Sequence, residues 1–366
     1  MFAANNKISL RQLQVLLILD IFGTSVIILP RNIAKVAGND AWISVLIGSL
    51  IMATLTLVLT KFGERYPDKT VVEHMSELFS RPVGFILSMG LALKLVLSAG
   101  LELRIFCEII RQIMLFRTPI WVTAATMLLV CVYVAAGGYE CRGRVGEILF
   151  VLAFLPFLFV LAAVGTSADY KNLLPAFTHT PSEVWKGTLI TMLSFQGLEF
   201  LFLVFPYLER PKEAKKGVFS ATLLAAMLMT VIVILAIATF GEISVKNKLF
   251  PVLQMIDTVD FPGAILERQD MFMMWFWMVS AFASVSASIF FVTIILQRAF
   301  QREKTRTSRW LFLVAPGVFL IMLLPSNIAT AFKSMEKIKY YGDGFYILIL
   351  PFVLLFFDSV KRRMKS

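Results

Sequence analysis

The sequence has little charge and few of the residues that soluble enzymes use. Only 16% of its 366 residues are charged, against about 25% in soluble domains. Three cysteines, Cys107, Cys131 and Cys141, lie in or beside apolar runs without CxxC spacing, so they predict neither a disulfide framework nor a metal site. No P-loop, GxGxxG, HExxH or GxSxG motif occurs, and His74 and His179 both fall between apolar runs. These absences predict that the chain is not an enzyme, and nothing in it calls for a cofactor or a metal.

Apolar residues are what the chain has in excess. Hydrophobic residues make up 58% of it, and 33 of its residues are phenylalanine. Since a membrane-spanning helix needs about 20 mostly apolar residues, we predict an all-α integral membrane protein of about ten transmembrane helices, forming one domain over 1–366. The expected spans are 12–36, 41–62, 83–115, 119–137, 146–165, 185–208, 217–241, 271–299, 310–325 and 344–360.

The basic residues predict how the chain is oriented. With the N terminus inside, most lysines and arginines fall on the inner side, as in cytoplasmic loops generally. We therefore expect a multi-pass cell membrane protein whose N and C termini are both cytoplasmic. The densest basic stretches, 210–216 and 298–309, also fall inside, where they would hold the topology and contact anionic lipid.

Two of the predicted connections have structure of their own. Thr70 and Glu73 form a capping box ahead of an apolar face, which predicts a short helix at about 71–79 on the inner surface. The outer loop at 242–270 is unusually long and rich in apolar residues. It either covers an outward vestibule or forms a surface helix with no gating role, and the sequence does not separate these alternatives.

Spans one and six each contain an interruption. Each has one glycine beside polar residues near mid-span, Gly23 and Gly197, and a proline soon after, Pro30 and Pro206. Because the interruptions lie five spans apart, they predict a 5+5 inverted repeat with discontinuous helices 1 and 6, which is the LeuT-like transporter architecture. Repeat one would cover about 12–165 and repeat two about 185–360. The alternative is that both glycines serve helix packing alone.

Broken helices of this kind offer a binding site. Half-helix N termini attract a carboxylate, and freed backbone carbonyls hold a cation or an ammonium group, so a zwitterionic amino acid fits. Glu199, two residues past Gly197, would hold a ligand ammonium group as an anion, or would hydrogen-bond freed backbone when protonated. On span eight, Ser284 and Ser288 either line the site or serve close helix packing.

Six charged residues lie at apparent membrane depth, where each costs at least about 2.5 kcal/mol if unpaired. They are Asp20, Lys94, Glu102, Arg104, Glu108 and Glu199. Arg104 and Glu108 have the spacing for mutual neutralisation. Lys94 shares a helix face with Ser98 and Glu102; these charges either neutralise one another or support a binding site or a proton path. Asp20, Lys94 and Glu102 are accordingly the candidates for ion or proton coupling.

Several short motifs resemble those of the spore germination permease family. At the start of the chain these are Lys7-Ile-Ser9 with Gln12, then Gly23-Thr-Ser25, then Asp40-Ala-Trp42. In span six they are Phe195-Gln-Gly-Leu-Glu199 followed by Phe205-Pro-Tyr207.

The resemblance implies the B subunit of a nutrient germinant receptor, within the amino acid–polyamine–organocation transporter superfamily. It implies a place in the spore inner membrane and assembly with an A-subunit membrane protein and a C-subunit lipoprotein. It also implies a nutrient ligand, an amino acid or a sugar. Nucleic acid is not an expected partner, because the basic residues follow the loop pattern of a membrane protein. Ligand contacts carried over by the resemblance are Gly23, Thr24, Ser25, Phe195, Gln196, Gly197 and Glu199, with Ser98, Ser284 and Ser288 matched less closely.

Three functional hypotheses follow. In the first, a nutrient binds between spans one, three, six and eight and biases a conformational equilibrium, which signals to the partner subunits. In the second, the chain is an amino acid transporter coupled to H⁺ or Na⁺. In the third, it only anchors the partner subunits.

Overall fold

The structure is a computed structural model that describes residues 6–258, 270–301 and 307–364. Its first half contains one broken span and four continuous ones. The broken span consists of α1 (Leu10–Ile21) and α2 (Thr24–Ala37). The continuous spans are α3 (Ala41–Arg65), α5 (Arg81–Ile113), α6 (Ile120–Ala136) and α7 (Gly138–Ser167).

The second half repeats this order. Its broken span consists of α8 (Pro181–Met192) and, after an irregular stretch, α9 (Leu201–Val204). The spans that follow are α10 (Ala214–Asn247), α12 (Asp270–Ala299) and α13 (Thr307–Leu323). The last span combines α14 (Ile328–Ile338), a π-helix (Lys339–Ile349) and α15 (Leu350–Arg363).

The tenth span begins much earlier than the predicted residue 344. Asn327 caps α14, and the helical path then continues through Lys339 and Asp343 to Arg363. The sequence prediction missed this start because one side of α14 is polar, carrying Lys333, Glu336 and Lys337, and this dilutes the apolar signal. Lys339 therefore lies inside the helical bundle and not in an outer loop.

Six of the described helical segments are long and apolar enough to cross a membrane by length and composition, fewer than the ten predicted spans. Two of the remaining four are the broken spans: α2 is counted together with α3 in one segment, Thr24–Arg65, and α1, α8 and α9 are too short to be counted alone. The other two, α6 and α13, have 17 residues each, which is slightly below the usual spanning length.

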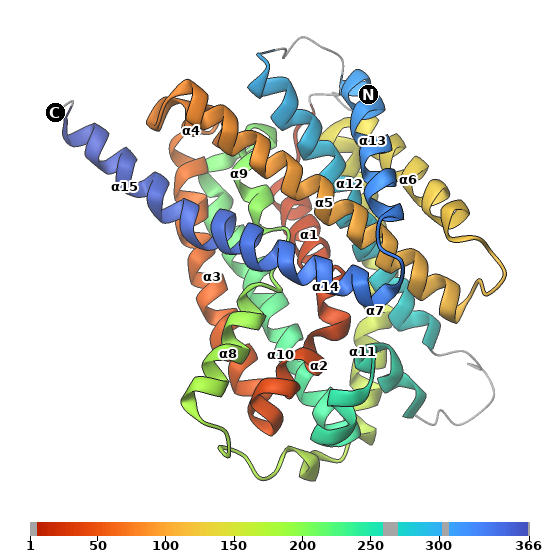
Figure 1. The fold of residues 1–366 in the computed structure, drawn as a ribbon. Coiled ribbons are helices and arrows are strands. Elements are labelled where there is room, and N and C mark those ends of the chain that lie inside the picture. Colours follow the sequence, from red (N-terminus) through yellow and green to blue (C-terminus); the bar gives the residue numbers. More distant parts are fainter. Residues whose placement is uncertain (1–5, 259–269, 302–306, 365–366) are drawn as a thin grey trace.

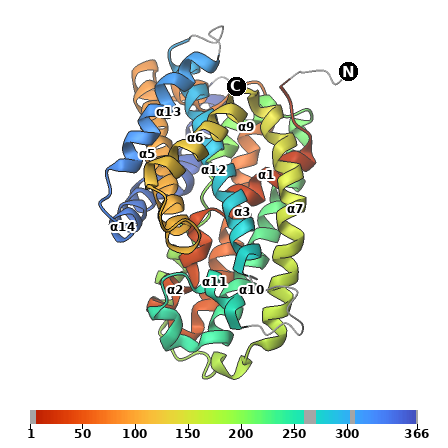
Figure 2. The same cartoon turned by 90° about the vertical axis from the view of Figure 1, so that its right-hand side faces the viewer.

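The helices pack around α12 (Figures 1 and 2). In its apolar segment 89% of the residues are buried, and it packs against α1, α5, α6, α7 and α13. Figure 2 shows α5, α13 and α14 on one side of the bundle and α7 on the other. Both ends of the described chain lie at the same end of the molecule (Figure 1), as expected for an even number of crossings.

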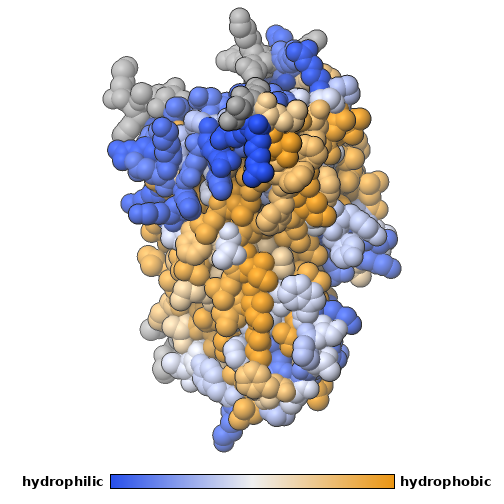
Figure 3. Space-filling model, turned by 90° about the vertical axis from the view of Figure 1, so that its left-hand side faces the viewer, coloured by the Kyte–Doolittle hydropathy of each residue, from blue (hydrophilic) through white to orange (hydrophobic). Residues whose placement is uncertain are grey.

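The outer surface has the character of a membrane protein. Figure 3 shows an apolar band across the middle of one face, with hydrophilic residues gathered at the end where the chain starts and finishes. Large apolar side chains such as Ile86, Leu129 and Phe312 are exposed around the bundle. Exposure of this kind is stable in lipid and would be costly in water.

The predicted helix after span two is present as α4 (Val71–Leu78), with the Thr70–Glu73 capping box in place. It buries Val71, Val72 and Met75 against the bundle. His74 also turns inward, where burial lowers the pKa of its imidazole. The position of α4 on the inner membrane surface stays a prediction.

The predicted outer loop is partly helical. Residues 242–247 continue α10 beyond a kink at Gly241, and α11 (Pro251–Gln254) packs against α2. Residues 259–269 lie outside the described part of the chain, as do residues 302–306 of the basic stretch at 298–309. The gating role of the loop and the repeat boundaries at 12–165 and 185–360 stay predictions.

Candidate functional site

The first break lies at Phe22 and Gly23, between α1 and α2. The backbone leaves the helical path at Gly23 (φ −52°, ψ −162°), and α2 starts at Thr24 without a capping side chain from Gly23. A β-carbon on Gly23 would lie 2.1 Å from Gln196 Nε2 and 2.7 Å from Glu102 Oε1. Glycine is therefore needed here because three spans converge on the backbone.

The second break covers residues 193–197, after α8. Gly197 has φ +90°, the left-handed conformation that side chains disfavour. A β-carbon on Gly197 would lie 2.7 Å from Asp20 Cβ, at the end of α1. The two breaks thus lie against each other, although 174 positions separate the two glycines (197 minus 23).

A carboxylate from span three fills the space between the breaks. Glu102 Oε1 accepts hydrogen bonds from Thr24 N (3.2 Å), Thr24 Oγ1 (3.2 Å) and Gln196 Nε2 (3.1 Å), and Oε2 accepts one from Ser284 Oγ (2.7 Å). It therefore joins spans one, three, six and eight. An open backbone N–H costs several kcal/mol in a membrane interior, and Glu102 removes that cost at the start of α2.

A second buried cluster lies beside the first. Lys94 of α5 forms ion pairs with Glu199, at the second break, and with Asp343 (2.5 Å), in the π-helix. The other carboxylate oxygen of Glu199 accepts a hydrogen bond from Gly197 N (2.9 Å). All three charged side chains are almost completely buried. The cluster therefore ties the second break to spans three and ten.

A third buried ion pair lies at the end of α1. Arg142 Nη2 is 2.5 Å from Asp20 Oδ1 and also donates a hydrogen bond to Ala283 O (3.2 Å). Arg142 Nη1 donates to Tyr139 Oη (3.2 Å). Asp20 is thereby paired with α7 and anchored beside α12.

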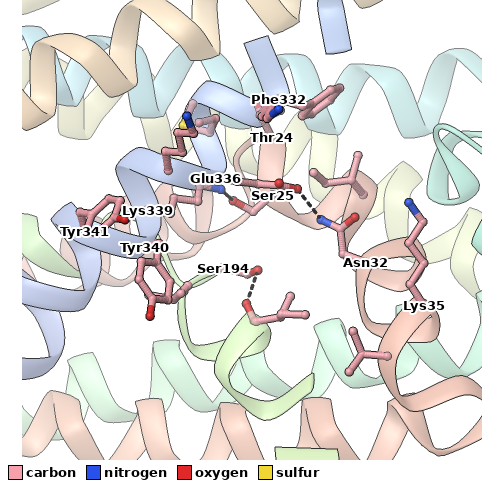
Figure 4. Close-up of a pocket in the computed structure, with 17 residues that line it drawn as sticks. Thr24, Ser25, Asn32, Lys35, Ser194, Phe332, Glu336, Lys339, Tyr340 and Tyr341 are labelled. Carbon is pink, nitrogen blue, oxygen red and sulfur yellow. Dashed lines mark hydrogen bonds between the residues drawn. The ribbon is translucent and has the colours of Figure 1, made fainter. Parts of the chain in front are cut away.

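A cavity of about 630 Å³ opens onto the first break. It lies between α2, the end of α8, and α14 with the following π-helix, and Thr24 and Ser25 line it. Lys339 donates a hydrogen bond to Ser25 Oγ, which in turn donates to Gln196 Oε1 (3.1 Å). Figure 4 shows Lys339 and Ser25 meeting in the cavity, with Tyr340 and Tyr341 beside Lys339 and Asn32 and Lys35 further along α2. A chain of hydrogen bonds thus links the cavity to Glu102.

The predicted site residues fall into three groups. Thr24 and Ser25 line the cavity. Beneath them, Glu102, Gln196 and Ser284 are joined by hydrogen bonds, and Gly23 lies in contact with this cluster. Buried away from the cavity wall are Phe195, Gly197, Glu199 and Ser288.

The ion pairs in the structure limit the roles predicted for Glu199, Lys94 and Glu102. Glu199 is already paired with Lys94, so in this conformation its carboxylate is not free to hold a ligand ammonium group. Lys94 pairs with Glu199 and Asp343 across helices and not with Glu102, whereas Arg104 and Glu108 neutralise each other as predicted (2.8 Å). Ser98 is half-buried on α5, and none of the described hydrogen bonds joins it or Ser288 to Glu102.

Three charged residues that the structure brings to the helix breaks are not among the predicted site residues: Arg142, Lys339 and Asp343. All were assigned to loops because each lies close to the end of an apolar run. Asp343, flanked by Gly342 and Gly344 in an apolar stretch, carried a signal comparable to that of Asp20. The sequence around Lys339 carried no such signal, because a lysine between two apolar runs is common in loops.

The three-dimensional arrangement defines a class of protein. The described fold is similar to that of Mhp1, a nucleobase-cation-symport-1 family transporter solved in a closed conformation with bromovinylhydantoin bound. The TM-score is 0.64 at 12% sequence identity, covering 93% of this chain and 77% of that chain. The protein is thus a multi-pass membrane protein with a LeuT-like transporter fold, in which broken helices 1 and 6 meet at the core.

Sequence comparison narrows the class to a family. Residues 7–331 match the family model described as "Spore germination protein", and the chain belongs to that family. It is 23% identical to Spore germination protein YndE of Bacillus subtilis (strain 168) over 365 residues, covering 99% of each chain. It is 27% identical to Spore germination protein KB of the same organism over 372 residues, covering 98% of this chain and 97% of the relative. The family and its transporter fold identify a germinant receptor or permease-like protein and not an enzyme.

Proposed function

We propose that this chain is the nutrient-sensing subunit of a spore germinant receptor. The observation that carries the proposal is the 630 Å³ cavity that reaches the first break and is linked by hydrogen bonds to Glu102. A cavity of this size suits a small molecule. The nutrient, an amino acid in this proposal, lies against α2 and the π-helix.

Signalling follows from the elements that the cavity joins. One wall belongs to the first repeat and the other to the tenth span, so a ligand that contacts both favours one separation of these walls over another. A ligand shifts such an equilibrium only by its difference in affinity for the two states. The receiving proteins are an A-subunit membrane protein and a C-subunit lipoprotein, in the spore inner membrane, with the termini of this chain on the cytoplasmic side and anionic lipid around the basic loops.

A cavity-filling substitution tests this function. Ile28 lines the cavity, and Ile28→Trp places an indole inside it; Leu129→Trp, on the exposed face of α6, is the matched control. Spores with Ile28→Trp are expected to need at least about tenfold more nutrient for germination at normal receptor abundance, since loss of about 1.4 kcal/mol of binding corresponds to that factor. A dose–response curve that coincides with the Leu129→Trp curve contradicts the proposal.

A coupled amino acid transporter is the second candidate, and the likeness to a symporter favours it. The buried Lys94 cluster beside the second break, together with Asp20 and Glu102, supplies the charged groups that H⁺ or Na⁺ coupling needs. Uptake of a labelled amino acid by proteoliposomes that contain this chain alone would favour transport. Binding without uptake would favour the receptor.

A further inference from the structure

Glu102 occupies the position where a transporter of this architecture offers its helix N terminus to an anion. The backbone N–H of Thr24, at the start of α2, and the Thr24 hydroxyl both donate to Glu102 Oε1. A ligand carboxylate at that position would lie next to a buried carboxylate, and two like charges at contact distance repel strongly. In this chain the acidic end of a ligand must therefore be held elsewhere.

Lys339 is the group best placed to hold it. Its side chain reaches into the cavity and donates to Ser25 Oγ, while an ammonium group has three donors. Among the residues that the structure describes, no carboxylate oxygen lies within 4.0 Å of its Nζ. By contrast, Lys94, one helix away, has two carboxylate partners. The ammonium of Lys339 thus has donors to offer and no counter-charge in contact.

Most of the other charged residues in the cavity lining are also positive. Lys35, Lys333 and Lys337 also line it, against one acidic residue, Glu336. Glu336 Oε1 accepts a hydrogen bond from Asn32 Nδ2 (3.5 Å) across the cavity. Several like charges around a concave, low-dielectric surface raise the local concentration of ligands of the opposite sign.

We propose that the ligand of this cavity carries a carboxylate, which pairs with Lys339 Nζ. The carboxylate also accepts the hydrogen bond that the Ser25 hydroxyl gives to Gln196 Oε1 in the described structure. The inference rests on the proposed function and names its ligand class: small carboxylic acids, amino acids among them, and not uncharged sugars. The remainder of the ligand lies against the apolar lining residues Ile28, Ile190 and Phe332. The ligand then bridges α2 and the π-helix. Because the π-helix also carries Asp343, a partner of Lys94, ligand binding acts directly on one element of the Lys94 cluster.

Matched ligand pairs test the carboxylate directly. Spores that carry the complete receptor are exposed to single amino acids, to the corresponding carboxamides and to glucose, and loss of refractility is followed across concentration. The carboxamide of the active amino acid is expected to be at least about 30-fold weaker, because removing one partner of a close, hydrogen-bonded charge pair costs 2 kcal/mol or more. The comparison uses the unchanged protein, so it does not depend on the folding of any variant.

Two variants assign the effect to Lys339. Lys339→Met is expected to weaken the response to the amino acid by at least about 30-fold and to remove most of its advantage over the carboxamide. Lys171→Met, an exposed lysine outside the cavity, is expected to change neither.

The outcomes separate the two proposals. A carboxamide or glucose as potent as the best amino acid, with Ile28→Trp still blocking germination, would overturn the carboxylate assignment and leave the cavity as the sensing site. A full carboxylate preference that persists in Lys339→Met would move the contact to another residue and also overturn the assignment. A normal response of Ile28→Trp would overturn the sensing site itself.

Discussion

Replacing Gly197 by alanine probes the contact between the two helix breaks. Gly197 has φ +90°, and a left-handed backbone costs a residue with a β-carbon about 1–2 kcal/mol. The new β-carbon would also lie 2.7 Å from Asp20 Cβ and 3.2 Å from the Asp20 carbonyl carbon. Because Asp20 is held by Arg142 (2.5 Å), neither contact relaxes easily, and overpacking of this kind costs about 1–3 kcal/mol. The expected loss of stability is about 2–5 kcal/mol in total.

Gly344→Ala is the matched control, since a β-carbon there meets no atom within 4 Å and its φ lies outside the left-handed range. The assay is thermal unfolding of the purified full chain in lipid nanodiscs, followed by circular dichroism. Gly197→Ala is expected to melt well below the parent chain and Gly344→Ala close to it. Gly197→Asn separates the two contributions, because asparagine tolerates the left-handed region but keeps the clash. Equal melting temperatures for Gly197→Ala and Gly344→Ala would refute the described geometry of the second break.

Three further predictions concern the buried polar groups. Lys94→Met leaves Glu199 and Asp343 without their cation and is expected to destabilise the fold by about 3–5 kcal/mol. The triple variant that adds Glu199→Gln and Asp343→Asn should recover most of this in the same unfolding assay; a parent-like Lys94→Met would contradict the ion pairs. Glu102→Gln is expected to cost about 1–3 kcal/mol, because an amide cannot accept hydrogen bonds at both ends; an unchanged melting temperature and nutrient response would count against the bonded cluster. Burial lowers the pKa of His74, so the imidazole binds a proton more readily in the unfolded chain than in the folded one. The contribution of neutral His74 to folding stability is therefore fully present above the ordinary histidine pKa of about 6.5 and falls as the pH decreases below it. His74→Phe, which keeps the ring contacts with Phe62 and Tyr66, should reduce this loss, and an identical pH dependence in both proteins would be evidence against it.

Local signals in the sequence predicted much of the fold. Each break combines a glycine with polar neighbours inside an apolar run, and the capping box at Thr70 and Glu73 marks the start of α4. Features of this kind depend on residues close together in the chain. They were sufficient to predict the interrupted helices and the transporter class.

The pairing of the charges could not be predicted in the same way. Spacing along α5 left open whether Lys94 and Glu102 neutralise each other or support a site. Their partners come from residues 78 to 249 positions away: Glu199 and Asp343 for Lys94, and Thr24, Gln196 and Ser284 for Glu102. Which side chains meet depends on the rotation of each helix in the bundle. A four-residue spacing does not specify that rotation.

Lys339 was missed for a related reason. The polar face of α14 lines a cavity inside the protein, although in the sequence it reads as a solvated loop. Hydropathy cannot tell a polar helix face that lines a cavity from a polar loop outside the membrane, because both are rich in charged residues. As a result, the residue to which the ligand contact is assigned lay outside every predicted site.

The most direct test of the account is an experimental structure of the full receptor with its activating nutrient at saturating concentration. We expect ligand density between Ser25 and Lys339, with residues 22–23 and 193–197 departing from regular helix near Glu102. Nutrient density in a partner subunit with this cavity empty, or continuous helix through both segments, would contradict the account.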